Sequence, residues 1–171
     1  DAGTTVTDVI GSGTDNHGNS YDFRFVDDTA LLSMKVGDTE YGVDEKVEKD
    51  GIIYYYFAPG KATNDKPYGY ELAYYPEGEE RFVWTINAPV SNFEPVQLTY
   101  TVELTNPQKA AGTYGEYDPD GSQELECLRT NAEAKLEPID SNGKPGESEF
   151  FLNPTVSYTV GGSEGGSDGG S

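Results

Sequence analysis

Apolar and polar residues alternate along most of this chain with a period of two, which is the pattern of half-buried β-strands. The clearest case is residues 97–104, where Leu98 and Tyr100 begin a series of apolar side chains separated by polar ones. No stretch has the i, i+3, i+4 spacing of an amphipathic helix, and the breaks between strands are turn-like. The pattern therefore predicts an all-β fold.

The predicted strands cover residues 4–10, 21–26, 30–36, 39–43, 51–57, 70–75, 81–86, 97–104, 125–136, 149–152 and 155–160. About ten short strands with frequent turns are typical of an antiparallel β-sandwich. Asn142-Gly143 predicts a hairpin turn before the strand at Phe150. We expect one domain over residues 1–160, followed by a flexible, acidic Gly/Ser linker over residues 161–171.

Asp8 interrupts this pattern. It lies between Val6 and Ile10 on one face of the first predicted strand, while Thr5, Thr7 and Val9 form the better candidate for the solvent side. A carboxylate on an apolar face is costly to desolvate unless it is paired or protonated. Two interpretations are open: an edge-strand or turn Asp before Gly11, or a buried proton donor inside a sandwich.

Composition limits the classes of function. The chain has 171 residues, 11 Lys and Arg against 31 Asp and Glu, and a net charge of −20. That charge repels phosphate backbones and anionic lipids, so we expect no nucleic-acid partner and no membrane insertion. The mean hydropathy is low, at −0.65, but 13 Tyr and 7 Phe supply enough apolar surface for a globular core.

The chain has few residues of the types that disulfides, zinc sites or catalytic triads need. Cys127 is the only cysteine and His17 the only histidine, so an internal disulfide, a zinc site and a local catalytic triad lack their residues. The acidic segments 118–124 and 140–143 resemble fragments of calcium loops without completing the motif, and acidic turns explain them better. We expect no metal and no cofactor.

Aromatic residues concentrate in one part of the chain, at Tyr54, Tyr55, Tyr56, Tyr68, Tyr70, Tyr74, Tyr75 and Trp84. Such side chains on one sheet face can stack on sugars, although aromatic strands more often serve core packing. The aromatic cluster supports an alternative function as a carbohydrate-binding module. No pair of carboxylates suited to glycosidase chemistry stands out among the 31 acids.

The remaining chemistry is an intramolecular isopeptide bond between Lys and Asn. It needs a neutral Lys amine, which burial supplies, and a protonated acid that polarises the Asn amide and passes protons as ammonia leaves. Asp8 suits the acid by its position on the strand, and Asn131 is the candidate acceptor. Such a bond forms once, so the chain is not expected to be an enzyme.

Four short stretches form an ordered set that carries a resemblance: residues 6–11, 83–86, 98–105 and 130–136. Together they resemble the segment that follows the von Willebrand factor A domain in pilus-tip and LPXTG-anchored adhesins of Gram-positive bacteria. The resemblance implies a CnaA-like, immunoglobulin-like antiparallel β-sandwich that is extracellular and attached to the cell wall. It also implies that Asp8 is the proton-shuttling acid and Asn131 the isopeptide acceptor.

Two features depart from that pattern. Strict alternation places Asn131 opposite Ala132 and Ala134, so it would need a bulge or a strand start to face inward. No lysine sits on an apolar face either; Lys35, for example, alternates against Met34 and Val36. In the adhesins that the chain resembles, the lysine strand precedes the A domain.

The sequence therefore predicts a structural stalk or scaffold module of a surface adhesin. Its expected partners are neighbouring domains of the same protein or a lysine-bearing strand in trans, with a host protein or glycan as a further class. The Asp-x-Ser-x-Ser motif of the A domain and the LPxTG signal are both absent from the sequence.

Overall fold

The computed structural model describes residues 2–89, 96–115, 128–137, 149–150 and 155–162. Within these residues the chain is all-β with antiparallel sheets and has no α-helix; one 3₁₀ turn, η1 (Thr29–Leu31), is the single helical element. The all-β prediction is confirmed. The chain divides into two compact units: unit 1 holds residues 1–9, 25–101 and 133–151, and unit 2 holds residues 10–24, 102–132 and 152–171.

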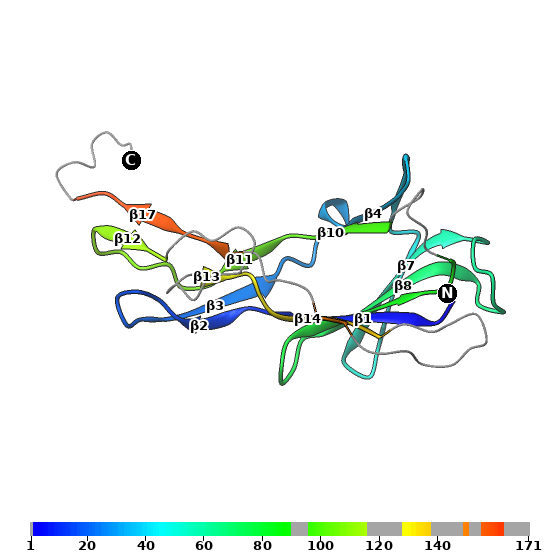
Figure 1. Cartoon of the computed structure of the whole chain (residues 1–171), viewed down its shortest axis with the longest axis horizontal. Helices are drawn as coiled ribbons and strands as arrows, with labels where there is room; N and C mark the ends of the chain where they lie inside the picture. The colour runs from blue at the N-terminus through cyan, green and yellow to red at the C-terminus, as the bar shows by residue number, and fades with distance from the viewer. Residues whose placement is uncertain (1, 90–95, 116–127, 138–148, 151–154, 163–171) are drawn as a thin grey trace. The chain divides into compact units, whose positions relative to one another are not determined.

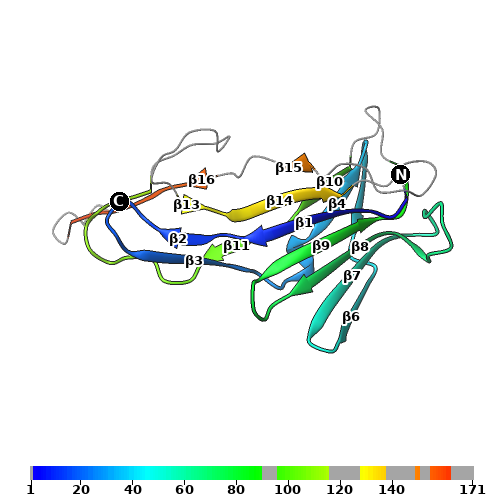
Figure 2. The ribbon, with the colours of Figure 1, turned by 60° about the horizontal axis from the view of Figure 1, so that its bottom comes forward.

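A seven-stranded sheet dominates unit 1 (Figure 2). Its order is β15 (Glu149–Phe150), β14 (Asn131–Glu137), β1 (Thr4–Ile10), β9 (Arg81–Ile86), β8 (Tyr68–Tyr75), β7 (Ile52–Pro59) and β6 (Glu45–Lys49). The pairings from β1 through β9, β8 and β7 to β6 are antiparallel, as is that of β14 with β15. The long strands β7 and β8 are rich in tyrosine and branched residues, which favour extended, half-buried backbone.

The strand register shows which side chains share a face of this sheet. Residues directly opposite one another share a face, so Phe82 stands in one row with Tyr74 and Ile53. Leu72 and Tyr55 stand in a neighbouring row on the same face, and both are fully buried. We call this side the inner face, and the opposite side the outer face.

A second layer lies over the inner face (Figure 1). It is the antiparallel sheet of β10 (Val96–Thr99), β4 (Ser33–Val36) and β5 (Thr39–Gly42). Met34 of β4 is fully buried, and Phe25 packs edge-on against Phe82 with ring centroids 4.8 Å apart. The core of unit 1 therefore lies between these two layers.

Unit 2 is built from shorter strands. One antiparallel hairpin joins β2 (Ser12–Thr14) to β3 (Ser20–Phe25), and β11 (Val102–Leu104) lies on the other side of β3. Two further pairs are β12 (Gly112–Tyr114) with β17 (Tyr158–Val160), and β13 (Leu128–Arg129) with β16 (Thr155–Val156). In the β2–β3 loop, Asp15 accepts hydrogen bonds from the backbone N–H groups of His17 and Asn19, at 2.8 and 2.9 Å.

Two strand predictions need correction. The predicted strand 97–104 is two strands, because β10 pairs with β4 whereas β11 pairs with β3. Residues 45–49 lie outside the predicted strands, yet they form the edge strand β6, whose charged side chains are usual at a sheet edge.

Several sequence predictions concern parts of the chain outside the described residues. These are Cys127, the calcium-like segments 118–124 and 140–143, the Asn142-Gly143 turn, and most of the predicted linker 161–171. The prediction of one domain over residues 1–160 stays a prediction.

Candidate functional site

Asp8 lies on the inner face of the seven-stranded sheet. Its direct neighbour across the β1–β9 pairing is Phe82, which is 1% exposed and packs in the core. The sequence pattern thus placed the carboxylate on the correct side of its strand. The opposite side is less open than expected, because Val9 is also buried.

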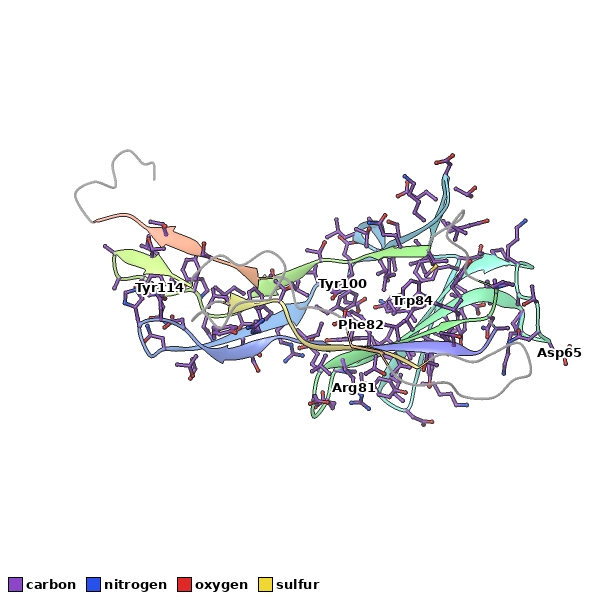
Figure 3. The ribbon with its side chains drawn as sticks, viewed as in Figure 1. Asp65, Arg81, Phe82, Trp84, Tyr100 and Tyr114 are labelled. Atoms are coloured by element: carbon purple, nitrogen blue, oxygen red, sulfur yellow. The ribbon has the colours of Figure 1, made fainter. Side chains whose placement is uncertain are left out.

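Tyr100 is the hydrogen-bond donor that holds this carboxylate. Its hydroxyl donates to Asp8 Oδ2 at 2.6 Å. The Tyr100 ring packs edge-on against Phe82 at 4.9 Å, and Figure 3 shows both side chains between the two layers. Burial raises the pKa of Tyr100, and the charge of Asp8 and the hydrogen bond to it raise that pKa further. The phenol therefore stays protonated and donates to Asp8 at neutral pH.

No direct signal in the sequence identifies the partner of Asp8. Tyr100 belongs to the predicted strand 97–104, and alternation placed it only on that strand's apolar face. Its position between β10 and β11 brings it to Asp8, 92 residues away in sequence. Covariation between the two positions would have been the signal.

Asn131 begins β14, the strand next to β1 in the seven-stranded sheet. The preceding residue, Thr130, accepts a hydrogen bond through its carbonyl oxygen from Gly11 N at 2.9 Å. A strand start is one of the two settings in which Asn131 was expected to turn inward. Its side chain lies outside the described part of the structure, and its role stays a prediction.

The lysines whose side chains the structure describes are all exposed: Lys35, Lys46, Lys49, Lys61, Lys66 and Lys109. Lys35 alternates with the buried Met34 in β4 and points away from the core, as the pattern predicted. A nucleophilic lysine must be desolvated to be neutral at physiological pH. None of these described lysines meets that requirement.

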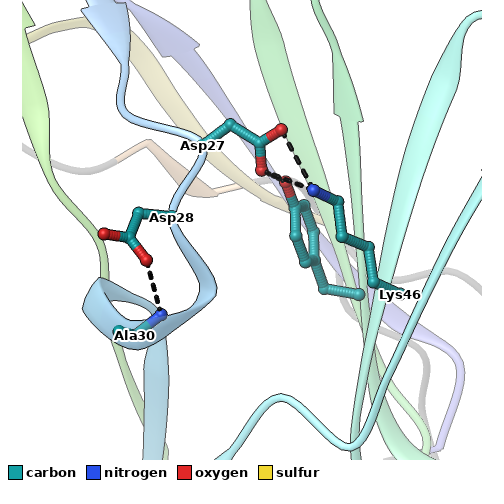
Figure 4. Close-up of polar contacts among 5 residues, drawn as sticks. Asp27, Asp28, Ala30 and Lys46 are labelled. Atoms are coloured by element: carbon teal, nitrogen blue, oxygen red, sulfur yellow. Dashed lines mark hydrogen bonds and ion pairs between the residues drawn. The ribbon is translucent and has the colours of Figure 1, made fainter.

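A polar cluster that no sequence motif indicated joins two exposed charged side chains to the buried Tyr55. Asp27 accepts hydrogen bonds from the Tyr55 hydroxyl and, at 3.1 Å, from Lys46 Nζ, and the Lys46 ammonium also lies 5.7 Å from the Tyr55 ring centroid (Figure 4). Burial raises the pKa of Tyr55, with the hydrogen bond to Asp27 as the next cause. Asp28, the next residue, caps η1 by accepting from Ala30 N at 3.0 Å. The cluster ties edge strand β6 to the segment after β3 and has the character of a structural contact.

The predicted aromatic platform divides between the two faces of the sheet. Trp84 stands opposite Val6 and Leu72 on the inner face, and Tyr55 belongs to the same row. Trp84 Nε1 is buried and has no hydrogen-bond partner among the described residues. A platform that combines Trp84 with Tyr54 and Tyr56 is therefore wrong, because the latter two lie on the outer face.

Tyr54 and Tyr56 join a third tyrosine on that outer face. Their rings are 14° from parallel with centroids 6.4 Å apart, and the Tyr56 and Tyr68 rings are 5.0 Å apart at 29°. All three belong to the aromatic cluster of the sequence, but only the ring contact shows that Tyr68, which stands opposite Pro59 in the β7–β8 pairing, lies beside Tyr56.

Within the described ranges, no group of three or more His, Cys, Asp or Glu side chains has the arrangement of a metal site. None of the described helical segments is long and apolar enough to cross a membrane. Comparison with known protein families, with curated proteins and with solved structures gave no match.

Proposed function

We propose that this chain is a structural stalk or scaffold module of a bacterial cell-surface adhesin, with an immunoglobulin-like, CnaA-like sandwich. The observation that carries the proposal is the position of Asp8, a carboxylate on the inner face of the sheet beside the buried Phe82. A module of this kind bears load and positions neighbouring domains, so it needs no catalytic turnover.

The proposed chemistry is a single isopeptide bond. A neutral lysine Nζ attacks Cγ of Asn131, the new C–N bond forms, and the amide nitrogen leaves as ammonia. Asp8, in its protonated form, polarises the Asn131 amide oxygen and passes a proton from the attacking amine to the leaving nitrogen. The hydrogen bond from Tyr100 fixes the orientation of the Asp8 carboxyl group.

The lysine of this proposal comes from outside the described residues. All lysines with described side chains are exposed, and an exposed ammonium stays charged and non-nucleophilic at neutral pH. A lysine-bearing strand from an upstream segment or from another chain would supply the nucleophile. The net charge of −20 favours association with such a cationic strand.

Intact mass spectrometry tests this function. The protein extended at its N-terminus by the preceding sequence of its parent polypeptide should weigh one ammonia less than its sequence mass. Asp8→Ala and Asn131→Ala should each restore the full mass, whereas Asp22→Ala, which alters an exposed carboxylate of β3, should not. Full mass in the extended wild-type protein would refute crosslink formation.

A further inference from the structure

A hollow of about 190 Å³ lies on the outer face of the seven-stranded sheet. The side chains that matter for its chemistry are Tyr56, Lys66, Tyr68, Glu71, Thr85 and Asn87. All six belong to unit 1. Because the hollow opens on the outer face, it is independent of Asp8 and of the proposed crosslink.

Strand register builds this hollow. Tyr56 of β7 stands directly opposite Glu71 of β8, and Glu71 stands directly opposite Thr85 of β9. Side chains at directly opposed positions have Cβ atoms about 5 Å apart. The sheet thus presents an aromatic ring, a carboxylate and a hydroxyl in one row across three strands.

Tyr56 and Tyr68 form the aromatic wall of the hollow, and contacts within the protein hold their rings in place. The Tyr68 hydroxyl lies 2.9 Å from both Asp44 Oδ2 and Glu45 Oε1 and shares its single hydrogen between these two acceptors. The Tyr56 ring stacks on the Tyr68 ring, with centroids 5.0 Å apart. Fixed side chains lose little conformational freedom on binding a ligand, so a preorganised wall favours binding.

Glu71 is the polar centre of the hollow. It is half-buried, and burial raises its pKa, while the nearby charge of Lys66 lowers it. Among the described residues the Glu71 carboxylate accepts no hydrogen bond. A half-buried carboxylate with no hydrogen-bond donor among the described side chains has oxygens that can accept from hydroxyl groups of a ligand.

Lys66 and Thr85 supply the polar groups that complement Glu71, and the buried Asn87 forms part of the wall. The Asn87 side-chain carbonyl oxygen accepts from Asn64 Nδ2 at 2.9 Å, which orients its amide, and Lys66 brings an exposed ammonium to the edge of the hollow. Lys66, Thr85 and Glu71 together offer both hydrogen-bond donors and acceptors close to aromatic rings. Few classes of ligand use hydrogen-bond donors, hydrogen-bond acceptors and aromatic rings in one site.

We propose that this hollow binds one pyranose ring of a neutral glycan. The apolar C–H face of the sugar packs on the side of the stacked Tyr56 and Tyr68 rings that lines the hollow. Its hydroxyl groups donate to Glu71, and Thr85 and Lys66 donate to the sugar oxygens. The net charge of −20 disfavours acidic glycans and nucleotides.

A basic peptide is the competing occupant, because aromatic rings beside carboxylates also attract cations. Lys66 lines the same hollow, and its ammonium repels a cationic side chain at that position. The lining thus favours a neutral ligand with hydroxyl groups, and a basic peptide becomes an outcome of the test.

The test starts with the intact protein on an array of neutral glycans that end in glucose, galactose, mannose, N-acetylglucosamine or N-acetylgalactosamine. The best-binding glycan is then titrated against Tyr56→Leu and Thr85→Val. Tyr75→Leu is the matched control, because Tyr75 is a tyrosine of β8 that does not line the hollow. Its ring lies 4.1 Å from the Arg81 guanidinium. Trp84 fluorescence verifies that each variant is folded.

We expect saturable binding of at least one neutral glycan. Tyr56→Leu and Thr85→Val should each weaken it at least tenfold, and Tyr75→Leu should change it less than twofold. Saturation-transfer NMR on the unaltered protein provides a second measurement, with the strongest transfer expected at the C–H protons of one sugar face. No binding on the array, binding that neither variant weakens, or binding of a lysine-rich peptide in place of the glycans would each overturn the proposal.

Discussion

Replacing Tyr100 with Phe removes the hydroxyl that donates to Asp8 and leaves the ring in place against Phe82. The lost contact is a 2.6 Å hydrogen bond between a phenol and a carboxylate. Hydrogen bonds to charged groups contribute about 1.5–3 kcal/mol when partly buried, so we expect the free energy of unfolding to fall by about 2 kcal/mol. The retained ring contact at 4.9 Å adds no packing loss to this value.

A double-mutant cycle with Asp8→Asn isolates the charge-dependent part. A bond from Tyr100 to a neutral amide oxygen contributes about 1 kcal/mol, so Tyr100→Phe should cost about 1 kcal/mol less in the Asp8→Asn background. Urea unfolding at pH 7, followed by the fluorescence of Trp84, the only tryptophan, measures all four variants. Equal losses in both backgrounds, or a loss below about 0.5 kcal/mol in the wild type, would refute the assigned interaction.

Three further predictions concern other parts of the fold. Burial raises the pKa of Tyr55 above its unfolded value, so the folded state keeps a proton that the unfolded state loses above about pH 10, and stability should fall as the pH rises through that range. Between pH 8 and 11 the urea midpoint should fall less steeply in Tyr55→Phe than in the wild type, since Tyr100 still contributes to the fall. Gly11→Ala should lower the free energy of unfolding by at least about 3 kcal/mol in thermal or urea unfolding, because an added Cβ would lie 1.7 Å from the carbonyl oxygen of Arg129. The control Gly42→Ala, which has open space around the added Cβ, should cost less than about 1 kcal/mol. Lys46→Ala removes an ion pair whose partners are both more than a third exposed, and unfolding free energies should change by no more than about 1 kcal/mol; a loss above 2 kcal/mol would contradict this surface assignment.

Much of the architecture was readable from alternation. The period-two pattern located the strands around Asp8, Tyr55, Phe82 and Met34, and it placed Asp8 and Met34 on the correct faces. This works because successive side chains of a strand point to opposite sides, so burial of one face leaves a trace in the sequence.

The pattern failed where pairing, not burial, decides the structure. Residues 97–104 alternate without interruption, yet the chain changes partner near Tyr100, and a single-strand pattern carries no information about which strand it will pair with. Strand β6 has charges on both sides of Val47, so it lacks the apolar face that would have predicted it.

For the candidate sites too, the sequence shows what lies within one strand but not what different strands bring together. Asp8 was identifiable because a carboxylate on an apolar face is anomalous within its own strand. The contacts of Tyr100 with Asp8 and of Tyr68 with Tyr56, and the row from Tyr56 to Thr85, join separate segments of the chain, and a single-strand pattern does not show which segments meet. Trp84 was assigned to a sugar platform by composition, and the register moved it to the inner face.

Tandem mass spectrometry of the N-terminally extended protein tests the proposed role of Asp8 and Asn131 most directly. After proteolysis, the peptide that contains Asn131 should be joined to a lysine-bearing peptide with the loss of one ammonia, and Asp8→Ala should abolish the joined species. Recovery of the Asn131 peptide unjoined and at full mass from the folded, extended protein would contradict the account.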